Sequence, residues 1–192
     1  EDVYSQDVIV NVEDDVSITT QPQDIEECIG GSEILTVAIT GGTGTTTYQW
    51  ESNSSTFPAG FTDIIGATSA TYLPSSATVG TMYYRVIADA SGIGCDAIIS
   101  EIATVVITPD ATISAAPVSS EICTGGSVNL IATLTGGSSA VSYQWQYSLD
   151  GLTGWGNVGA PNTAVYNVSP GTVGVHFYRI VVADALSGCS QP

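Results

Sequence analysis

The sequence repeats itself once over a distance of about 95 residues. The run Cys28–Ser32 returns as Cys123–Ser127, and Tyr48–Trp50 returns unchanged as Tyr143–Trp145. Solenoid repeats have periods of roughly 20–50 residues, whereas this period is the size of a whole small domain. The duplication therefore predicts two copies of one compact domain in tandem.

The two ends of the chain fall at the same phase of the repeat. Asp15–Ile18 matches Asp110–Ile113, so the apolar run Val8–Val12 corresponds to the strand that ends the first unit. We therefore expect an orphan last strand or donor strand in residues 1–12, a first domain in 13–108, and a second domain in 109–192 that lacks its last strand. Matches in the later part of each unit extend the repeat. They pair Tyr84–Val86 with Tyr178–Ile180, Ala88–Ala90 with Ala183–Ala185, and Gly94–Cys95 with Gly188–Cys189.

Short runs of alternating apolar and polar residues dominate both units. Examples are Leu35–Ile39, Tyr83–Ile87, Ala103–Ile107, Val128–Leu134 and Phe177–Val182. β-Branched and aromatic residues are frequent in these runs, and Gly, Ser, Asn and Asp separate them, which is typical of strands and turns. The pattern predicts an all-β protein built as antiparallel β-sandwiches.

Several positions predict an immunoglobulin-like core. Each unit has a strand that ends in a tryptophan, Trp50 or Trp145, and a later strand with a tyrosine, Tyr84 or Tyr178. Where antibody domains carry their inter-sheet cysteines, this sequence has apolar residues, with Val37 expected to face Val86 and Ala132 to face Ile180. Burial of such apolar pairs stabilises a sandwich without a crosslink.

The combined motifs, Cys-x-Gly-Gly, Tyr-Gln-Trp, Tyr-Arg-Val/Ile and Gly-Cys, resemble the Ig-like tandem repeats of large secreted surface proteins and adhesins of the Bacteroidota, gliding-motility adhesins among them. The resemblance covers nearly the whole chain. It implies a secreted, cell-surface module with no catalytic residues.

The cysteines occupy matching positions, Cys28 and Cys123 early in each unit, and Cys95 and Cys189 late. Paired cysteines favour an oxidising, extracellular setting. The repeat favours one bond within each unit, Cys28–Cys95 and Cys123–Cys189. In a standard Ig layout, however, these segments lie at opposite ends of the domain, so bonds between neighbouring domains or chains are the alternative.

The charge is strongly one-sided, with 19 acidic residues against two arginines and no lysine, giving a formal net charge of −17. Such a chain is a poor partner for nucleic acid or for an anionic membrane surface. No apolar run is long enough to insert into a membrane as a helix. Arg85 and Arg179 are repeat equivalents, and we expect each to form a cross-strand ion pair or to lie over an aromatic ring.

Among the polar residues we considered one possible metal site and one possible catalytic residue. Asp14, Asp15 and Asp110 lie at the expected domain junctions, where carboxylates can bind Ca²⁺, although we favour a solvated acidic surface as their explanation. His176 is the single histidine, and its equivalent is Met82, so we expect a surface position rather than catalysis. The sequence predicts no enzyme.

A domain without its last strand exposes unpaired backbone groups and part of its core. The strand can come from a following part of the same chain, or Val8, Ile9, Val10 and Val12 of another chain can supply it. We therefore expect an extracellular structural or adhesive repeat module that meets neighbouring Ig-like repeats, surface glycans or other cell-surface proteins. The alternative is a carbohydrate-binding accessory region of a large secreted glycan-degrading enzyme, with Tyr147, Trp155 and Phe61 as candidate stacking rings.

Overall fold

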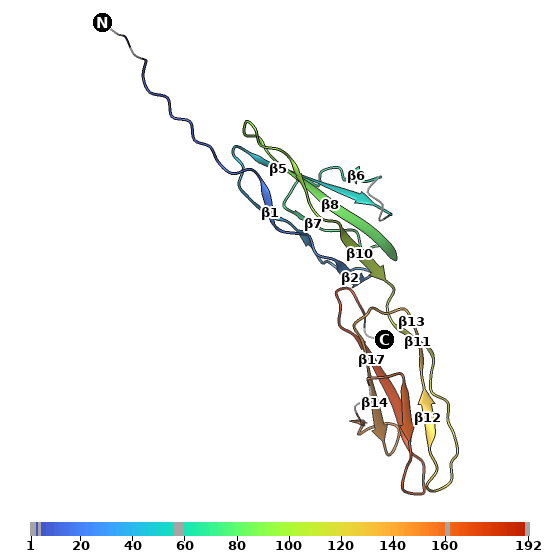
Figure 1. Ribbon diagram of the computed structural model, residues 1–192. Coiled ribbons are helices and arrows are strands. Elements are labelled where there is room, and N and C mark those ends of the chain that lie inside the picture. The colour runs from blue at the N-terminus through green and yellow to red at the C-terminus, as the bar shows by residue number, and fades with distance from the viewer. Residues whose placement is uncertain (1–2, 4, 56–59, 160–161, 191–192) are drawn as a thin grey trace. The chain divides into compact units, whose positions relative to one another are not determined.

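The computed structural model describes residue 3 and residues 5–55, 60–159 and 162–190, and within them all regular structure is β-strand. The expected all-β class is confirmed (Figure 1). The strands of the first repeat are β1 (Ser17–Thr20), β2 (Ile25–Cys28), β3 (Leu35–Thr36), β4 (Ala38–Thr40), β5 (Thr46–Asn53), β6 (Thr62–Asp63), β7 (Thr71–Tyr72), β8 (Gly80–Ala90), β9 (Ile98–Ile99) and β10 (Ala103–Thr108). Those of the second are β11 (Thr112–Ala115), β12 (Val128–Ile131), β13 (Thr133–Thr135), β14 (Val141–Ser148), β15 (Gly156–Asn157), β16 (Val165–Val168) and β17 (Phe177–Asp184).

Contacts divide the chain into two compact units whose borders differ from the repeat borders. The first unit comprises Glu1–Asp24, Ile34–Leu73 and Met82–Val105. The second unit comprises Ile25–Glu33, Pro74–Thr81 and Val106–Pro192. The segment around Cys28 therefore belongs by its contacts to the unit that contains the second repeat.

The long strand β8 organises the larger sheet, whose strand order is β2-β10-β8-β5-β6, with β9 also paired to β8. β5 and β8 are antiparallel, and their register places Trp50 opposite Val86. Both side chains are fully buried, and the Trp50 indole donates a hydrogen bond of 2.8 Å to the carbonyl of Ser69. The indole N–H thereby keeps a partner inside the core.

The second repeat builds the same arrangement from β14 and β17. Trp145 lies opposite Ile180, and its indole donates to the carbonyl of Thr163 at 3.0 Å. Trp145 is fully buried, and its core cluster includes Ala132, Ile180 and Val182. Tyr84 is buried, whereas its equivalent Tyr178 is only half-buried.

The register corrects one of the sequence matches. Thr46 pairs with Ala90 in the first repeat, and its equivalent Val141 pairs with Asp184 in the second. Asp184 is therefore the structural equivalent of Ala90, and the Ala-Asp-Ala motifs are out of step by one residue. Strand pairing keeps the core face constant along β8 and β17, so the identity of a short motif does not decide the alignment.

The two repeats differ at one edge of the sheet. In the first repeat, β10 lies between β8 and β2. In the second, the sheet order is β15-β14-β17, so β17 is an edge strand within the described part of the chain. Residues 120–123 are the equivalents of β2 but form no strand. The candidate site lies at this edge of the second repeat.

Candidate functional site

A disulfide joins Cys28 to Cys189 within the second unit. Their Cα atoms are 4.8 Å apart, and the Cys28 N–H donates to the carbonyl of Ser187 at 2.9 Å. This differs from the favoured pairing of Cys28 with Cys95 and of Cys123 with Cys189. The end of β2 lies against the turn that follows β17, and sequence spacing alone does not reveal such a meeting of two distant turns.

Cys95 and Cys123 carry no disulfide within the described residues. The Cys95 thiol lies 3.8 Å from the hydroxyl of Thr43, and Cys123 is exposed to solvent. These are the late cysteine of the first repeat and the early cysteine of the second. Of the two early cysteines, Cys28 is bonded and Cys123 is a free thiol; of the two late cysteines, Cys189 is bonded and Cys95 is a free thiol.

A groove of about 850 Å³ opens on the second unit. The segment 117–124 borders it on one side, and residues 172–178, which lead into β17, border it on the other. Cys123, Leu130 and Tyr178 are among its lining residues. The groove therefore lies between the equivalent of β2 and the equivalent of β8.

The core of the second unit is less covered near this groove than the core of the first. Leu35 and Val86 of the first repeat are 1% and 0% exposed, whereas their equivalents Leu130 and Ile180 are both 9% exposed. In the first repeat β10 lies beside β8, and its inward residues share in the core. In the second repeat, β14 is the strand that pairs with β17 within the described residues.

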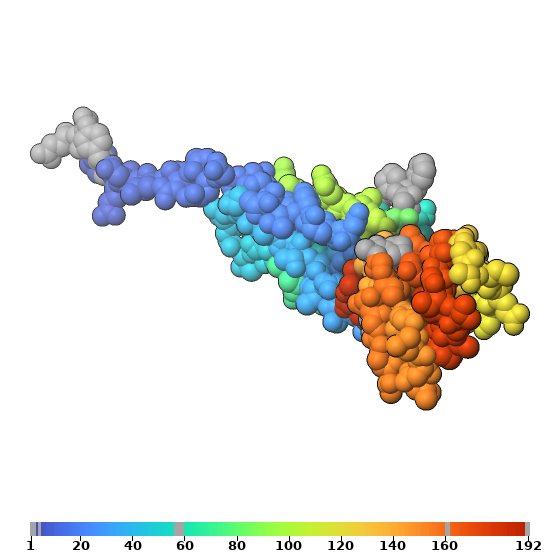
Figure 2. All heavy atoms as spheres, turned by 90° about the horizontal axis from the view of Figure 1, so that it is seen from below, coloured from blue at the N-terminus to red at the C-terminus, as the bar shows by residue number. Residues whose placement is uncertain are grey.

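Residues 5–16, before β1, are an extended chain outside any strand (Figure 1). Its apolar side chains Val8, Ile9, Val10 and Val12 are between 80% and 91% exposed. In the face that Figure 2 shows, this segment, drawn in blue, projects outward from the strands that follow it. Exposed apolar patches are frequent at interaction sites.

Two hydrogen bonds fix the repeat phase of this segment. Gly42 donates to the carbonyl of Asp14, and Gly137 donates to the carbonyl of Pro109, both at 2.8 Å. Asp14 is therefore the structural equivalent of Pro109. Counting back from there, Val12 has the phase of Ile107, the last inward residue of β10.

The arginines adopt both expected arrangements. The Arg85 side chain donates to the Glu51 carboxylate at 2.5 Å across the β5–β8 pair, and its guanidinium lies 4.4 Å from the centre of the Phe61 ring. Arg179 donates to Gln146 at 2.8 Å and lies 4.3 Å over Trp155. The rings of Phe61 and Trp155, which we considered for sugar stacking, are thus each covered by a cation on one face.

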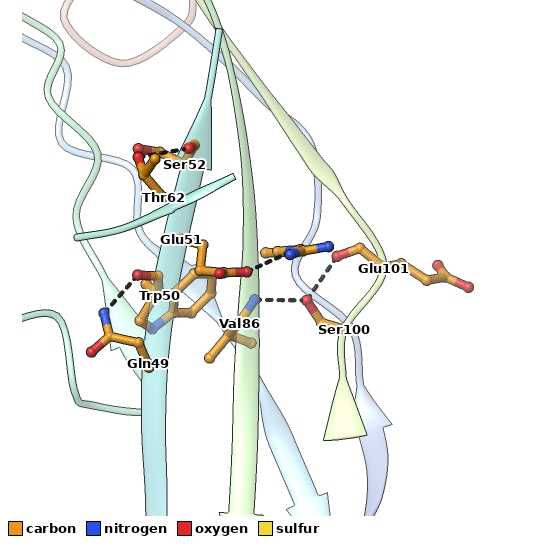
Figure 3. Close-up of polar contacts among 9 residues, drawn as sticks. Gln49, Trp50, Glu51, Ser52, Thr62, Val86, Ser100 and Glu101 are labelled. Carbon is orange, nitrogen blue, oxygen red and sulfur yellow. Dashed lines mark hydrogen bonds and ion pairs between the residues drawn. The ribbon is translucent and has the colours of Figure 1, made fainter. Parts of the chain in front are cut away.

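Polar contacts around Glu51 tie β5 and β8 to the chain before β10 (Figure 3). The Ser100 hydroxyl accepts from the Val86 N–H at 3.0 Å and donates to the Glu101 carbonyl at 2.7 Å. Gln49 donates to the carbonyl of Trp50 at 2.8 Å. These hydrogen bonds connect β5, β8 and the segment that precedes β10.

The carboxylates proposed for calcium bind backbone N–H groups. Asp15 accepts from the N–H of Asp96 at 3.3 Å, and its equivalent Asp110 accepts from the N–H of Ser190 at 3.0 Å. The cluster of potential metal ligands in the described residues is Cys28, Asp184 and Cys189, which includes none of Asp14, Asp15 and Asp110. Both thiols of that cluster are consumed in the disulfide.

Two aspartates have lowered pKa values. Burial alone would raise the pKa of Asp184, but hydrogen bonds from the hydroxyl and N–H of Ser138 outweigh it and lower the pKa. The pKa of Asp150 falls well below its usual range, because the N–H and hydroxyl of Thr153 and the N–H of Leu152 donate to its carboxylate. Both carboxylates thus accept hydrogen bonds from nearby turns.

His176 lies at the rim of the groove. Its Nδ1 is 3.2 Å from the Tyr147 hydroxyl, and its Nε2 is 3.0 Å from the carbonyl of Thr172. The ring also stacks on Tyr147 at 5.9 Å between centroids. Tyr147 and His176 thus support the start of β17.

No helix among the described residues is long and apolar enough to cross a membrane.

The fold is that of tandem immunoglobulin-like β-sandwiches. Similar solved structures are Sidekick-1 immunoglobulin domains 1–4 (12% identity, TM-score 0.52, covering 93% of this chain and 47% of that one) and Drosophila OTK extracellular domains 3–5 (16%, 0.50, 88% and 57%). The fibronectin(III)-like modules of Clostridium thermocellum CbhA match with 15% identity and a TM-score of 0.43 over 88% of this chain and 85% of that one. The chain spans about half the length of the first two.

The sequence itself identifies a family. The chain belongs to the family described as "Domain of unknown function (DUF8696)", whose model matches residues 18–109 and again 111–192. No curated protein matches the sequence. The two family matches coincide with the two sequence repeats.

Proposed function

We propose that the chain is an extracellular structural module of a surface stalk, adhesin or filament, and that its copies join head to tail by strand addition. In this arrangement Val8–Val12 of one copy fills the groove on the second unit of another copy. The disulfide suits an oxidising compartment. The sequence resemblance to repeats of Bacteroidota surface proteins points to the same location.

The observation that carries the proposal is the match between Val8–Val12 and β10. Val8, Val10 and Val12 have the repeat phase of Ala103, Val105 and Ile107. The latter three are the inward residues of β10 and are 1–5% exposed, whereas the former are 80–91% exposed. The N-terminal segment thus has the inward face of a last strand, and within the described residues that face covers no core.

The groove on the second unit is the proposed acceptor site for this strand. Addition of a strand to the edge of β17 would satisfy backbone groups there and reproduce the β2-β10-β8 order of the first repeat. Leu130 and Tyr178, which line the groove, would gain the cover that their equivalents Leu35 and Tyr84 already have. A second copy of this chain is therefore the occupant that fits.

Burial of each valine contributes about 1.5–3 kcal/mol. Three of them contribute on the order of 5–9 kcal/mol, against an association cost of roughly 4–15 kcal/mol. Backbone hydrogen bonds along β17 must therefore add to the apolar contacts. The non-covalent junction is expected to be reversible and dependent on concentration.

The test measures the mass of the chain in solution by light scattering across a range of concentrations. Cys95 and Cys123 are replaced by serine, so that no disulfide forms between copies while the Cys28–Cys189 bond stays intact. We expect oligomers whose mass rises with concentration. Val10→Asp places a charge on the inward face of the donor strand and should leave monomers only. Asn11→Asp adds the same charge at a position equivalent to the half-buried Val106, on the opposite face, and should preserve assembly.

Neither variant should alter the fold of the single chain, because residues 5–12 make no strand there; equal melting temperatures check this. Monomers of the chain that carries only the two serine substitutions, at every concentration, would contradict the proposal. Equal loss of assembly in both variants would also contradict it, because the inward face would then have no special role. Labelling of intact cells with antibodies to the chain tests the extracellular location.

A further inference from the structure

We infer that successive copies are also linked covalently, by a disulfide between Cys123 of one copy and Cys95 of the next. This inference rests on the proposed head-to-tail strand addition and names the bond that would lock it. The thiols concerned are the two that remain outside the Cys28–Cys189 bond within the described part of the chain.

The Cys28–Cys189 bond indicates which cysteines should pair between copies. Cys28 is the early cysteine of the first repeat, and it bonds Cys189, the late cysteine of the repeat that follows. Cys123 is the early cysteine of the second repeat, so its partner by the same rule is the late cysteine of the next repeat. In a head-to-tail series of copies, that residue is Cys95 of the next copy.

The groove places Cys123 where this bond requires it. Cys123 lines the groove. In the second unit, the N–H of Ile29 donates to the carbonyl of Thr108 at 3.2 Å, and the Thr108 hydroxyl lies 3.6 Å from the Cys28 sulfur. Glu13 has the phase of Thr108, so a donor strand seated in the groove ends beside Cys123. The first unit of the incoming copy then begins at that point.

The turns that present the late cysteines are alike. Cys189 donates to the carbonyl of Leu186 and Cys95 donates to the carbonyl of Gly92, both at 3.3 Å. Gly188 and Gly94 precede them with φ of 76° and 84°. The Cys95 turn therefore has the backbone shape of the turn that already forms a disulfide.

The surroundings of the two turns differ in the way that the inference requires. A Cβ on Gly188 would lie 2.3 Å from the Gly31 nitrogen and 2.7 Å from the Cys28 carbonyl oxygen, whereas a Cβ on Gly94 would meet nothing within 4 Å. Ile93, next to Gly94, is fully exposed. The Cys95 turn thus has the form of a docked turn without its docking segment, and the Cys123 segment of another copy supplies one.

Bond formation removes one proton and one electron from each thiol. A disulfide such as glutathione disulfide accepts them and is reduced to two molecules of glutathione thiol, so the exchange balances. The thiolate of Cys123 or Cys95 first attacks the oxidant to give a mixed disulfide, and the other thiolate then displaces the reduced leaving group.

The experiment uses two single variants, Cys95→Ser and Cys123→Ser, incubated with glutathione disulfide alone and as an equal mixture. Non-reducing gels of the mixture should show a linked dimer that cannot grow, because each member offers one of the two thiols. Each variant alone should run as a monomer on these gels, because detergent separates copies that are not covalently linked. The unmodified chain should give a ladder that dithiothreitol collapses, and the added Val10→Asp substitution should remove the ladder.

Mass spectrometry identifies the linkage. Trypsin has cleavage sites after Arg85 and Arg179, and the fragment 86–179 contains both Cys95 and Cys123. A mixture of ¹⁵N-labelled and unlabelled chains should yield this fragment as linked pairs of mixed isotope composition. A fragment that contains an internal Cys95–Cys123 bond would overturn the inference.

The failures separate the two proposals. Reversible oligomers without a mixed-variant crosslink would overturn the covalent link and leave strand addition standing. Monomers throughout would overturn strand addition as well. Dimers formed equally by each variant alone would indicate adventitious thiol oxidation and would also overturn the link.

Discussion

Cys28 and Cys189 are bonded although 161 positions separate them in the sequence. The bond attaches an early segment of the first repeat to the last turn of the second, within one contact unit. A crosslink over so long a stretch of chain restricts the unfolded state strongly.

We expect Cys28→Ser to lower the free energy of unfolding of the second unit by about 2–4 kcal/mol. The matched control is Cys95→Ser, which removes a thiol that has no bond in the single chain and should leave stability unchanged. Thermal and urea unfolding of monomeric protein measure the difference. Equal effects of the two substitutions would contradict a stabilising role for the bond.

Gly188→Ala and Gly94→Ala separate backbone strain from close approach. Both glycines have positive φ, so each alanine should cost on the order of 1–2 kcal/mol. Gly188→Ala should cost more, because its Cβ would overlap the backbone of Gly31. The comparison is made by urea unfolding. A larger effect at Gly94 would show that the close approach at Gly188 is unimportant.

The lowered pKa of Asp184 predicts that the folded chain loses stability in acid. Its pKa is lowered in the folded state, so its contribution is present above the unfolded value of about 3.9 and is lost as the pH falls through the folded value. Asp184→Asn should flatten the dependence of unfolding free energy on pH below about pH 4. Ser138→Ala should cost about 1.5–3 kcal/mol at neutral pH, since a hydrogen bond to a charged group is lost. An unchanged acid profile in Asp184→Asn would contradict this role.

The arginine sites should respond differently to salt. Arg85 pairs with the charged Glu51, whereas Arg179 pairs with the neutral Gln146. The cost of Arg85→Ala should therefore shrink as salt rises, and that of Arg179→Ala should change less. Arg179→Ala should also shift the tryptophan emission to the red, because Trp155 loses its cover while Trp50 and Trp145 stay buried. An unshifted spectrum would contradict the stacking.

Head-to-tail assembly should strengthen with salt. Each chain has a formal net charge of −17, so copies repel one another at low ionic strength. Screening shortens the range of this repulsion to about 8 Å at physiological ionic strength. Light scattering at several sodium chloride concentrations measures the effect. Weaker assembly at higher salt would contradict a junction built on apolar side chains and backbone hydrogen bonds.

Much of the fold followed from residue patterns. Alternation in runs such as Tyr83–Ile87 predicted strands because a half-buried strand has one apolar and one polar face. The repeat also gave the phase of Val8–Val12, which the hydrogen bonds at Asp14 and Pro109 later matched. The site was less predictable. The Ala-Asp-Ala motif around Asp184 predicted an alignment of the two repeats that is wrong by one residue. Glu51 and Gln146 were not predicted as partners of the arginines.

The sequence alone determined the all-β class and the tandem repeat, because both depend on local periodicity and on duplication. The tertiary structure decided which cysteines meet and where a groove opens. Disulfide pairing depends on the distance between turns that are far apart in the chain, and a groove depends on which strand lies beside which. Neither quantity is contained in local spacing.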